Sequence, residues 1–182
     1  MKMIPNSIDN SNDKLWGETT IFHQFKNLDR DYIVLHSLDI PNHIAHAQGE
    51  ADFVVIAPGI GIIVLEVKGG AIKYKNGIFH YVKRGIKTSQ AKNPFKQCED
   101  NMFSIKKEFD EHFKHNKSYK NLLWSWGVIF PHTRFNVQGF EFEKWRVWDQ
   151  DNMNQTIDRF LVGLAVNTKK DFPNKRAVKK EE

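Results

Sequence analysis

The stretch that most constrains the fold of this chain runs from Ala51 to Gly70 and reads ADFVVIAPGIGIIVLEVKGG. Two runs rich in Val, Ile, Phe and Leu flank a Pro-Gly-Ile-Gly sequence at positions 58–61. Branched and aromatic side chains of this kind suit a pleated, buried surface, and Pro-Gly marks a tight turn. The pattern therefore predicts two adjacent strands joined by a turn.

Three charged residues interrupt this apolar stretch: Asp52 at its start, and Glu66 and Lys68 near its end. Side chains alternate along a strand with period two, so Glu66 and Lys68 point to the same face. If the strands pair symmetrically about the turn, Asp52 lies near them. Burial of charge is costly unless the charge is paired or bound to a metal. We therefore expect a divalent metal site that cleaves phosphodiester bonds.

Composition narrows the class of protein. The chain has 182 residues, 40% of them hydrophobic and 13% aromatic, as expected for a single folded domain. It has no apolar run of about 18 residues, so we expect no membrane span. The first residues lack an apolar segment, so we expect no signal peptide. Cys98 is the only cysteine, which excludes an internal disulfide and a thiolate zinc cage and favours a cytoplasmic location.

The chain divides into three parts by composition. We expect a flexible N-terminus over residues 1–14, a folded domain over 15–166, and a charged tail or truncated linker over 167–182. Within the domain, apolar periodicity and turn signals predict helices and strands in a fixed order. They are a helix over 15–29, a strand over 32–38, the central pair, a hairpin about Asn76-Gly77, a loop over 83–92, a helix from Asn93-Pro94, strands over 122–130 and 145–148, and a helix over 154–166. This order predicts a mixed sheet flanked by helices.

Further polar residues are candidates for the same site. Glu18 falls on the apolar stripe of the first helix, although an acid near a helix start also complements the helix dipole. Gln97 lies in the first turn of the helix that follows Pro94. Glu50 shares the face of Asp52 and is either a site member or a surface acid. His43 and His46 lie beside Pro41 in a predicted loop with no matching third ligand nearby, which disfavours zinc.

Positive charge is concentrated in the middle of the chain. The net charge is +5, but residues 73–120 contain twelve Lys or Arg against five acids, a local excess of seven. A basic stripe is typical of proteins that bind a polyanion, although a solvated helix and hairpin face has the same composition. The members that we expect to contact nucleic acid are Lys83, Arg84, Lys87, Lys92 and Lys96.

The order of these motifs resembles a known family. An acid on one strand followed by Glu-x-Lys on the next is similar to the PD-(D/E)xK nuclease superfamily, although Ala51 replaces its proline. The wider pattern resembles the nuclease-related domain (NERD) family over roughly residues 15–165. That pattern comprises Gly17-Glu18, QGEADFVV at 48–55, Gly59-Ile60, EVKGG at 66–70, the Asn-Gly hairpin and NPFKQ at 93–97.

The resemblance implies an α/β fold: a restriction-endonuclease-like core, with a mixed central β-sheet flanked by α-helices on both sides. It also implies Mg²⁺-dependent cleavage of DNA, and we expect Mn²⁺ to substitute. Members of the family often stand beside helicase, kinase or topoisomerase-like modules, so such a module in cis or in trans is an expected partner. DNA repair and defence against foreign DNA are both natural settings for this activity.

The chemistry of the residues agrees with that implication. Mg²⁺ prefers oxygen ligands and usually keeps several waters, so Asp52 and Glu66 suit it, with the carbonyl of Val67 as a further ligand. Lys68 can orient or help to deprotonate the attacking water and offset charge on the phosphate. We expect Glu18 to be an outer carboxylate or a ligand of a second metal. Gln97 resembles the glutamine of the family and is expected to hold a phosphate or the water.

Two other functions fit parts of the sequence. One is a catalytically idle DNA-binding or targeting module of a larger helicase-type assembly, but such a module would usually lose an acid or the lysine. The other is a structural protein in which Glu66 and Lys68 form only an ion pair. An exposed pair stabilises a protein by less than about 1 kcal/mol, so it explains little.

Overall fold

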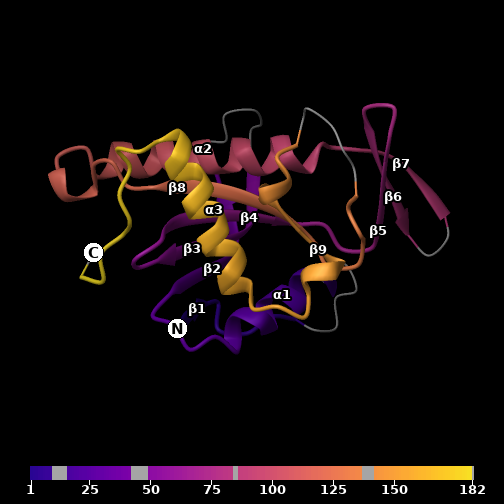
Figure 1. Ribbon diagram of the computed structural model, residues 1–182, viewed down its shortest axis with the longest axis horizontal. Helices are drawn as coiled ribbons and strands as arrows, with labels where there is room; N and C mark the ends of the chain where they lie inside the picture. Colours follow the sequence, from indigo (N-terminus) through magenta and orange to yellow (C-terminus); the bar gives the residue numbers. More distant parts are fainter. Residues whose placement is uncertain (10–15, 42–48, 84–85, 137–141, 182) are drawn as a thin grey trace.

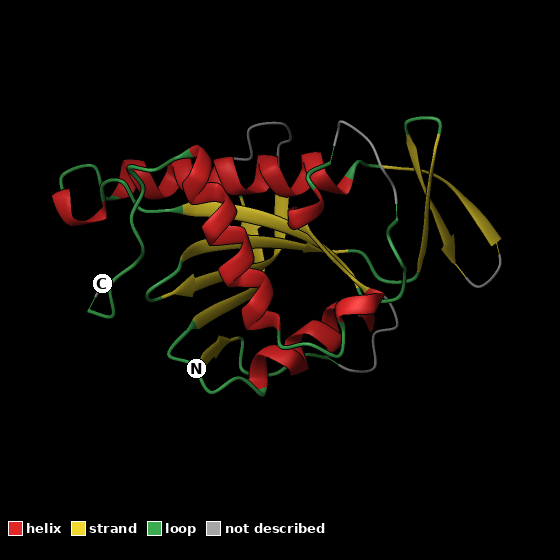
Figure 2. Ribbon diagram, in the orientation of Figure 1, coloured by secondary structure: helices red, strands yellow, loops and turns green. Residues whose placement is uncertain are grey.

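The computed structural model describes residues 1–9, 16–41, 49–83, 86–136 and 142–181, with the backbone alone over 82–91. Its centre is a six-stranded sheet (Figures 1 and 2). In spatial order the strands are β1 (Lys2–Ile4), β2 (Ile33–Ile40), β3 (Gly49–Ala57), β4 (Gly61–Val67), β8 (Trp124–Phe130) and β9 (Val147–Asp149). The β2, β3 and β4 strands are antiparallel, whereas β1 pairs with β2, β8 pairs with β4, and β9 pairs with β8 in parallel. The sheet is therefore mixed, as predicted.

The predicted central pair of strands forms the middle of this sheet. Ala57 pairs with Gly61 across the turn, and Phe53 pairs with Leu65 further along. Every residue of β4 is buried, which agrees with a strand covered on both faces. These pairs are symmetric about the turn, as the sequence suggested, and Asp52 and Glu66 follow directly after the last of them.

Helices cover both faces of the sheet (Figure 1). On one face, α1 (Trp16–Lys26) and α3 (Ile157–Asp171) bury Phe22, Phe25 and Leu161 against odd-numbered residues of β3 and β4. On the other face, α2 (Pro94–His112) buries Phe95, Cys98 and Met102 against even-numbered residues of the same strands. Helices on both sides of a mixed sheet confirm the predicted restriction-endonuclease-like core.

A smaller three-stranded sheet lies at one end of the molecule (Figure 2). It contains β5 (Ala71–Lys75), β6 (Ile78–Lys83) and β7 (Ile86–Ala91). The predicted hairpin about Asn76 and Gly77 is present, and both residues have the positive φ that a two-residue hairpin turn requires. The predicted loop over 83–92 is wrong, because β7 pairs with the free edge of β6 and so satisfies its backbone groups there.

The ends of the chain also differ from the sequence prediction. Residues 2–4 belong to the sheet, and Met3 is buried in the core, although we assigned residues 1–14 to a loose segment. Helix α3 continues to Asp171, five residues beyond the predicted end at 166. Val178 is buried and bridges to Pro58, so the charged segment after 167 packs on the domain. The three-part division by composition therefore does not match how these terminal residues pack.

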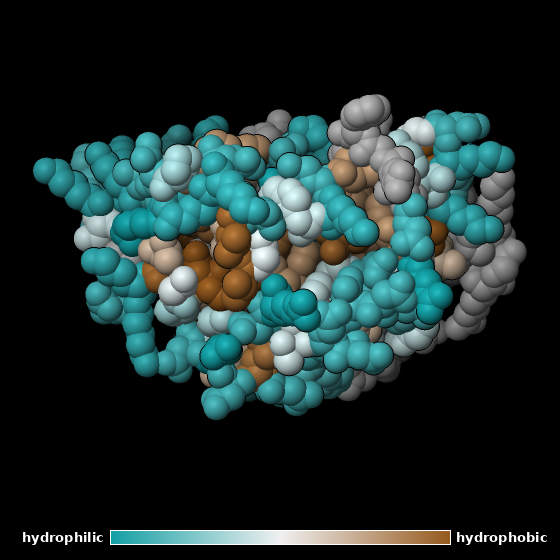
Figure 3. Space-filling view, in the orientation of Figure 1, coloured by the Kyte–Doolittle hydropathy of each residue, from teal (hydrophilic) through white to brown (hydrophobic). Residues whose placement is uncertain are grey.

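The remaining elements close the fold. Short 3-10 helices occur at η2 (Lys117–Tyr119), η3 (Lys144–Arg146) and η4 (Gln150–Asn152). Most side chains on the face shown in Figure 3 are hydrophilic, with apolar side chains in its central part. No helix in the described part of the chain is long and apolar enough to span a membrane.

Candidate active site

The β3–β4 hairpin brings three of the predicted residues together. The side chains of Glu66 and Lys68 form an ion pair, which confirms that they share a face. Asp52 Oδ2 accepts a hydrogen bond of 2.6 Å from the backbone N–H of Val67. The backbone N–H of Lys68 donates to the carbonyl of Ile129 at 2.9 Å, so β8 fixes the end of β4. The carboxylates are thus held by rigid strands rather than by a loop.

Both carboxyl groups are destabilised in their charged form. Burial, and next the charge of Glu66, hold the pKa of Asp52 well above its usual value, although Lys68 and the Val67 N–H oppose this shift. Burial also raises the pKa of Glu66, whose side chain is fully buried, and the charge of Lys68 opposes that rise. Burial is thus the main cause for both groups, and a bound cation would favour their charged forms.

Lys68 carries the positive charge of the site. Burial by itself would lower the pKa of this ammonium group, but Glu66 and Asp52 outweigh burial and raise it. Lys68 is therefore a cation at neutral pH. Tyr81, on β6, lies within electrostatic reach of the three residues, and burial together with Glu66 and Asp52 raises the pKa of its hydroxyl to about 12.

Glu18 lies on α1 and approaches the end of β4 from the face of the sheet opposite to α2. Its Oε2 atom lies 2.8 Å from Nε2 of His36, a buried residue of β2. The His36 ring also packs on Phe22 and Phe53, on the α1 side. The negative charge of Glu18 contributes, after burial, to the raised pKa of both Asp52 and Glu66. Its expected roles, as an outer carboxylate or as a ligand of a second metal, stay predictions.

A close approach of two glycines brings α1 to the end of β4. A Cβ atom on Gly17 would lie 2.8 Å from the Cα of Gly69, nearer than side chains tolerate. The same Cβ would lie 3.3 Å from a methyl group of Val67. Gly17 precedes Glu18, and Gly69 follows Lys68, so this contact sets how far Glu18 stands from the hairpin. Both glycines belong to the motifs by which the sequence was recognised.

Helix α2 covers the other side of the carboxylates. Asn101 is buried, and its amide donates to the carbonyl of Glu50 at 2.8 Å and to Glu66 Oε2 at 3.4 Å. Gln97 is partly buried one turn earlier, on the face of Asn101. Glu50 is exposed. Burial is the main cause of the raised pKa of Glu66, the charge of Lys68 opposes that rise, and the charge of Glu50 adds to it. The structure thus places Gln97 and Glu50 beside the site without a described side-chain bond to it.

The residues present suit a hard divalent cation bound through water and a small number of carboxylates. No group of three or more His, Cys, Asp or Glu side chains among the described residues is arranged as a metal cage. Mg²⁺ does not require such a cage, because it usually binds one or two carboxylates and keeps several waters. Asp52 and Glu66 would supply that donor set, and burial is the main reason why their pKa values are raised. Val67 follows Glu66 in the chain, and its backbone N–H donates a hydrogen bond to Asp52.

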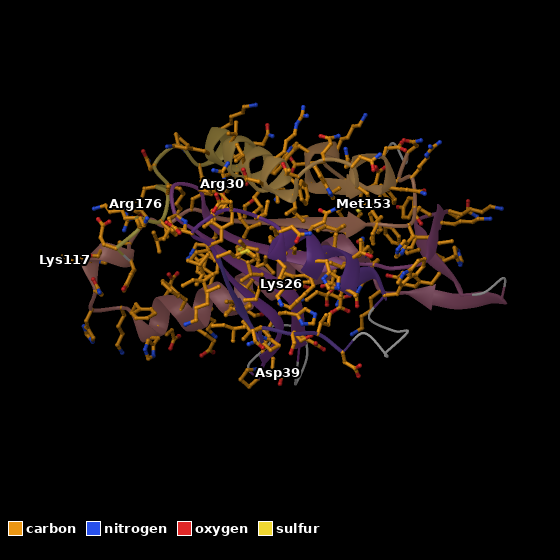
Figure 4. The ribbon with its side chains drawn as sticks, turned by 90° about the horizontal axis from the view of Figure 1, so that it is seen from below. Lys26, Arg30, Asp39, Lys117, Met153 and Arg176 are labelled. Carbon is orange, nitrogen blue, oxygen red and sulfur yellow. The ribbon has the colours of Figure 1, made fainter. Side chains whose placement is uncertain are left out.

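The predicted nucleic-acid contacts are described only in part. Lys92 and Lys96 are exposed at the start of α2, and Lys96 pairs with Asp100 at 2.6 Å. Lys83 and Lys87 lie on β6 and β7, where the structure describes the backbone alone, and Arg84 lies outside the described residues. The segment with His43 and His46 also lies outside them. Figure 4 shows Lys117, near the end of the basic stripe, at the end of the molecule away from β5–β7.

Three residues near the site were not predicted: His36, Tyr81 and Asn101. A signal existed for two of them. His36 and Val34 lie on the same buried face of β2, where a histidine side chain requires a hydrogen-bond partner. Asn101 lies four residues after Gln97 and beside the buried Met102 in an amphipathic helix. Tyr81 had no such signal, because its distance from the site depends on how the sheet of β5, β6 and β7 packs on the rest of the domain.

A mixed sheet with helices on both faces, and an acid and a Glu-x-Lys sequence on neighbouring strands, defines a restriction-endonuclease-like domain. The family model of the nuclease-related domain (NERD) matches residues 14–131, more than half of this chain. The chain therefore belongs to the NERD family, and this agrees with the PD-(D/E)xK superfamily inferred from sequence. Comparison with curated proteins and with solved structures found no significant match.

Proposed function

We propose that this protein is a metal-dependent deoxyribonuclease that hydrolyses phosphodiester bonds, with Mg²⁺ as its metal and Mn²⁺ as a substitute. The observation that carries the proposal is the placement of Asp52, Glu66 and Lys68 at one strand end in a chain of a nuclease-related family. DNA repair and defence against foreign DNA are both processes that use such an activity.

Asp52 and Glu66 would hold the metal, with Val67 able to add its carbonyl oxygen. A bound Mg²⁺ lowers the pKa of a coordinated water and neutralises charge on the scissile phosphate. The raised pKa values of Asp52 and Glu66 support this assignment, since a cation between them would offset burial and mutual repulsion. Asn101 would keep Glu66 in place through its hydrogen bond to Oε2.

Lys68 would act as a cation that positions the attacking water and stabilises negative charge on the phosphate as it develops. The raised pKa of Lys68 favours this role over proton abstraction, because its ammonium form is strongly preferred beside Glu66. Glu18 would add negative charge from the α1 side, and Gln97 would hold a phosphate oxygen or the water from the first turn of α2.

Cleavage assays with supercoiled, linear and single-stranded DNA test this function. We expect cleavage with Mg²⁺ or Mn²⁺ and none with EDTA. Asp52→Ala, Glu66→Gln and Lys68→Ala should each lower the rate by about a hundredfold or more, since each removes a group that acts on the reacting phosphate or its metal. Asp39→Asn, which changes an exposed acid on β2 (Figure 4), is the control and should cleave normally.

The alternative is a catalytically idle DNA-binding or targeting module of a helicase-type assembly. DNA binding by the wild-type protein without cleavage under any of these metal conditions would support that module instead. Full activity in Glu66→Gln would reject the site. Calorimetry with Mg²⁺ adds an independent readout: the wild-type protein should bind the ion, and Asp52→Ala should not.

A further inference from the structure

An exposed aromatic stack lies at the edge of the candidate site. The rings of Trp16 and His132 are 3.5 Å apart and differ by 8° in orientation, so they lie face to face. Trp16 is 59% exposed, more than any other large apolar side chain described. A tryptophan with this exposure loses the free energy that burial would supply, which is unusual for so large an apolar side chain.

The histidine beneath this indole is held in place by the backbone. His132 Nδ1 accepts a hydrogen bond of 3.2 Å from the N–H of Gly70. The next residue, Thr133, donates its hydroxyl proton to the Gly70 carbonyl at 2.9 Å and accepts the N–H of Ile72 at 3.0 Å. These bonds tie the end of β8 to the segment that leaves β4. The stack is therefore a fixed surface at the end of two strands.

The position of the Trp16–His132 stack follows from the contact between Gly17 and Gly69. Trp16 precedes Gly17 in α1, and Gly69 follows Lys68 at the end of β4. A Cβ on Gly69 would lie 3.8 Å from Nδ1 of His132. The stack thus borders the strand end that carries Glu66 and Lys68, on the α1 side of the sheet.

We propose that Trp16, backed by His132, is a stacking platform for the base of an unpaired nucleotide in the substrate. An open aromatic ring can stack on a base only when that base has left a duplex or ends one, because paired bases already stack on their neighbours. Such stacking is tolerant of sequence, since every base has a π face. This proposal rests on the proposed function, and it makes single-stranded segments, overhangs or frayed ends the preferred substrate class.

The platform also complements the basic residues. Lysines attract phosphates whatever the strand structure, whereas an aromatic platform discriminates between free and paired bases. The competing role for the stack is structural: it would fasten α1 to the end of β8. That role predicts a change in stability when Trp16 is replaced, and no dependence of binding on the bases of the ligand.

Fluorescence anisotropy with three DNA ligands separates these roles. The ligands are a single strand, an abasic strand of equal length and charge, and a duplex closed at both ends by linkers without bases, each in EDTA to prevent cleavage. The wild-type protein should bind the single strand about tenfold more tightly than the abasic strand, in line with stacking of one base. Trp16→Ala should lose this difference, and Trp16→Phe should keep most of it.

Phe172→Ala is the matched control, because Phe172 is 56% exposed at the C-terminal cap of α3 and belongs to no site described above. It should keep the preference for bases. A single-stranded RNA ligand shows whether the platform accepts unpaired bases of RNA as well as those of DNA. Circular dichroism of each variant verifies that it is folded.

The possible results are distinct for the two proposals. Equal binding of the normal and abasic strands by the wild-type protein, or an unchanged preference in Trp16→Ala, overturns the platform even if the protein cleaves DNA. Preference for bases that depends on Trp16, in a protein that cleaves nothing with Mg²⁺ or Mn²⁺, supports the platform and overturns the nuclease.

Discussion

The carboxylate of Asp52 accepts a hydrogen bond from the backbone N–H of Val67, the residue between Glu66 and Lys68. This bond joins β3 to β4 beside the charged residues Glu66 and Lys68. It holds one carboxylate beside another although like charges on neighbouring strands repel. The bond also lowers the pKa of Asp52, but by less than burial and Glu66 raise it. The site is therefore organised at a cost in stability.

Removal of the Asp52 charge should stabilise the protein in the absence of metal. The pKa of Asp52 is higher in the folded chain than its usual value of 3.8, so the folded state binds more protons than the unfolded state above that pH. The free energy of unfolding therefore falls as pH rises from about 4 through the folded-state pKa. Asp52→Asn should raise it by about 1 kcal/mol at neutral pH, and the gain should shrink toward pH 4.

Thermal unfolding in EDTA at several pH values measures this effect. Asp39→Asn replaces an exposed acid on β2, where water screens its repulsion from Glu50 opposite, and should show a smaller gain. Mg²⁺ should then raise the melting temperature of the wild-type protein, because a ligand that binds only the folded state stabilises it, and should leave Asp52→Asn unchanged. A lower melting temperature for Asp52→Asn at every pH would show that the Val67 bond outweighs the repulsion.

The contributions of Glu66 and Lys68 to the free energy of unfolding should be strongly coupled. Glu66 is fully buried, so Lys68→Met leaves a carboxyl group without its cation. We expect a loss of about 3 kcal/mol in the free energy of unfolding at pH 7.5, typical of a buried pair that is broken on one side. Glu66→Gln in the same chain should recover much of that loss. Urea unfolding of the two single variants and the double variant gives the coupling energy, and purely additive changes would contradict a buried pair.

The parts of the fold that were predicted correctly are those fixed by neighbours in sequence. The β3–β4 hairpin follows from two apolar runs about Pro58 and Gly59, and the β5–β6 hairpin follows from Asn76 and Gly77. The start of α2 follows from Asn93, whose side chain accepts the N–H groups of Phe95 and Lys96. Each of these signals acts over a few residues, so no tertiary information was needed.

The errors occurred where distant segments decide the structure. Strand β7 forms because the edge of β6 is available to pair, which residues 86–91 alone do not reveal. Residues 2–4 form β1 because β2 offers a parallel edge, with Lys2 paired to Ile33. The same reason explains the missed members of the site. Asp52, Glu66 and Lys68 lie on one hairpin, whereas His36 and Asn101 reach it from β2 and α2.

Glu18 and Gln97 should affect the rate of cleavage more than stability. If Glu18 supplies negative charge to the site, Glu18→Gln should lower the rate while the domain stays folded. If Glu18 only complements the dipole of α1, its replacement should change stability by about 0.3–1 kcal/mol and leave the rate unaltered. Gln97→Ala should likewise lower the rate. Single-turnover cleavage and thermal unfolding, measured on the same preparations, distinguish these roles.

His36 offers a further check on Glu18. The pairing at 2.8 Å predicts that His36→Ala lowers the rate about as much as Glu18→Gln, because it releases the carboxylate from its position. The double variant should then be no slower than either single variant, since both remove the same contact. Rates that multiply in the double variant would show that His36 and Glu18 act independently.

The last prediction concerns how the basic residues hold DNA. Lysines and arginines attract phosphates and carry no sequence information themselves, and the sequence has no recognition helix rich in Asn, Gln and Arg. Affinity should therefore fall steeply with salt, with a slope of log K against log[salt] of roughly −0.9 for each phosphate neutralised on duplex DNA. Lys96 should add little, because it already pairs with Asp100 at 2.6 Å.

The triple variant Lys83→Glu, Arg84→Glu and Lys87→Glu tests the predicted contribution of the small sheet. It should weaken binding to all DNA sequences alike and flatten the salt dependence, because fewer cations are released when fewer phosphates are neutralised. Its cleavage rate at saturating DNA should match the wild-type rate, since these residues hold substrate rather than metal. Lys114→Glu, Lys117→Glu and Lys120→Glu reverse the same charge in the segment that follows α2, where Figure 4 shows Lys117 at the end of the molecule away from β5–β7. If both triple variants weaken binding equally, net charge rather than a defined contact surface determines affinity.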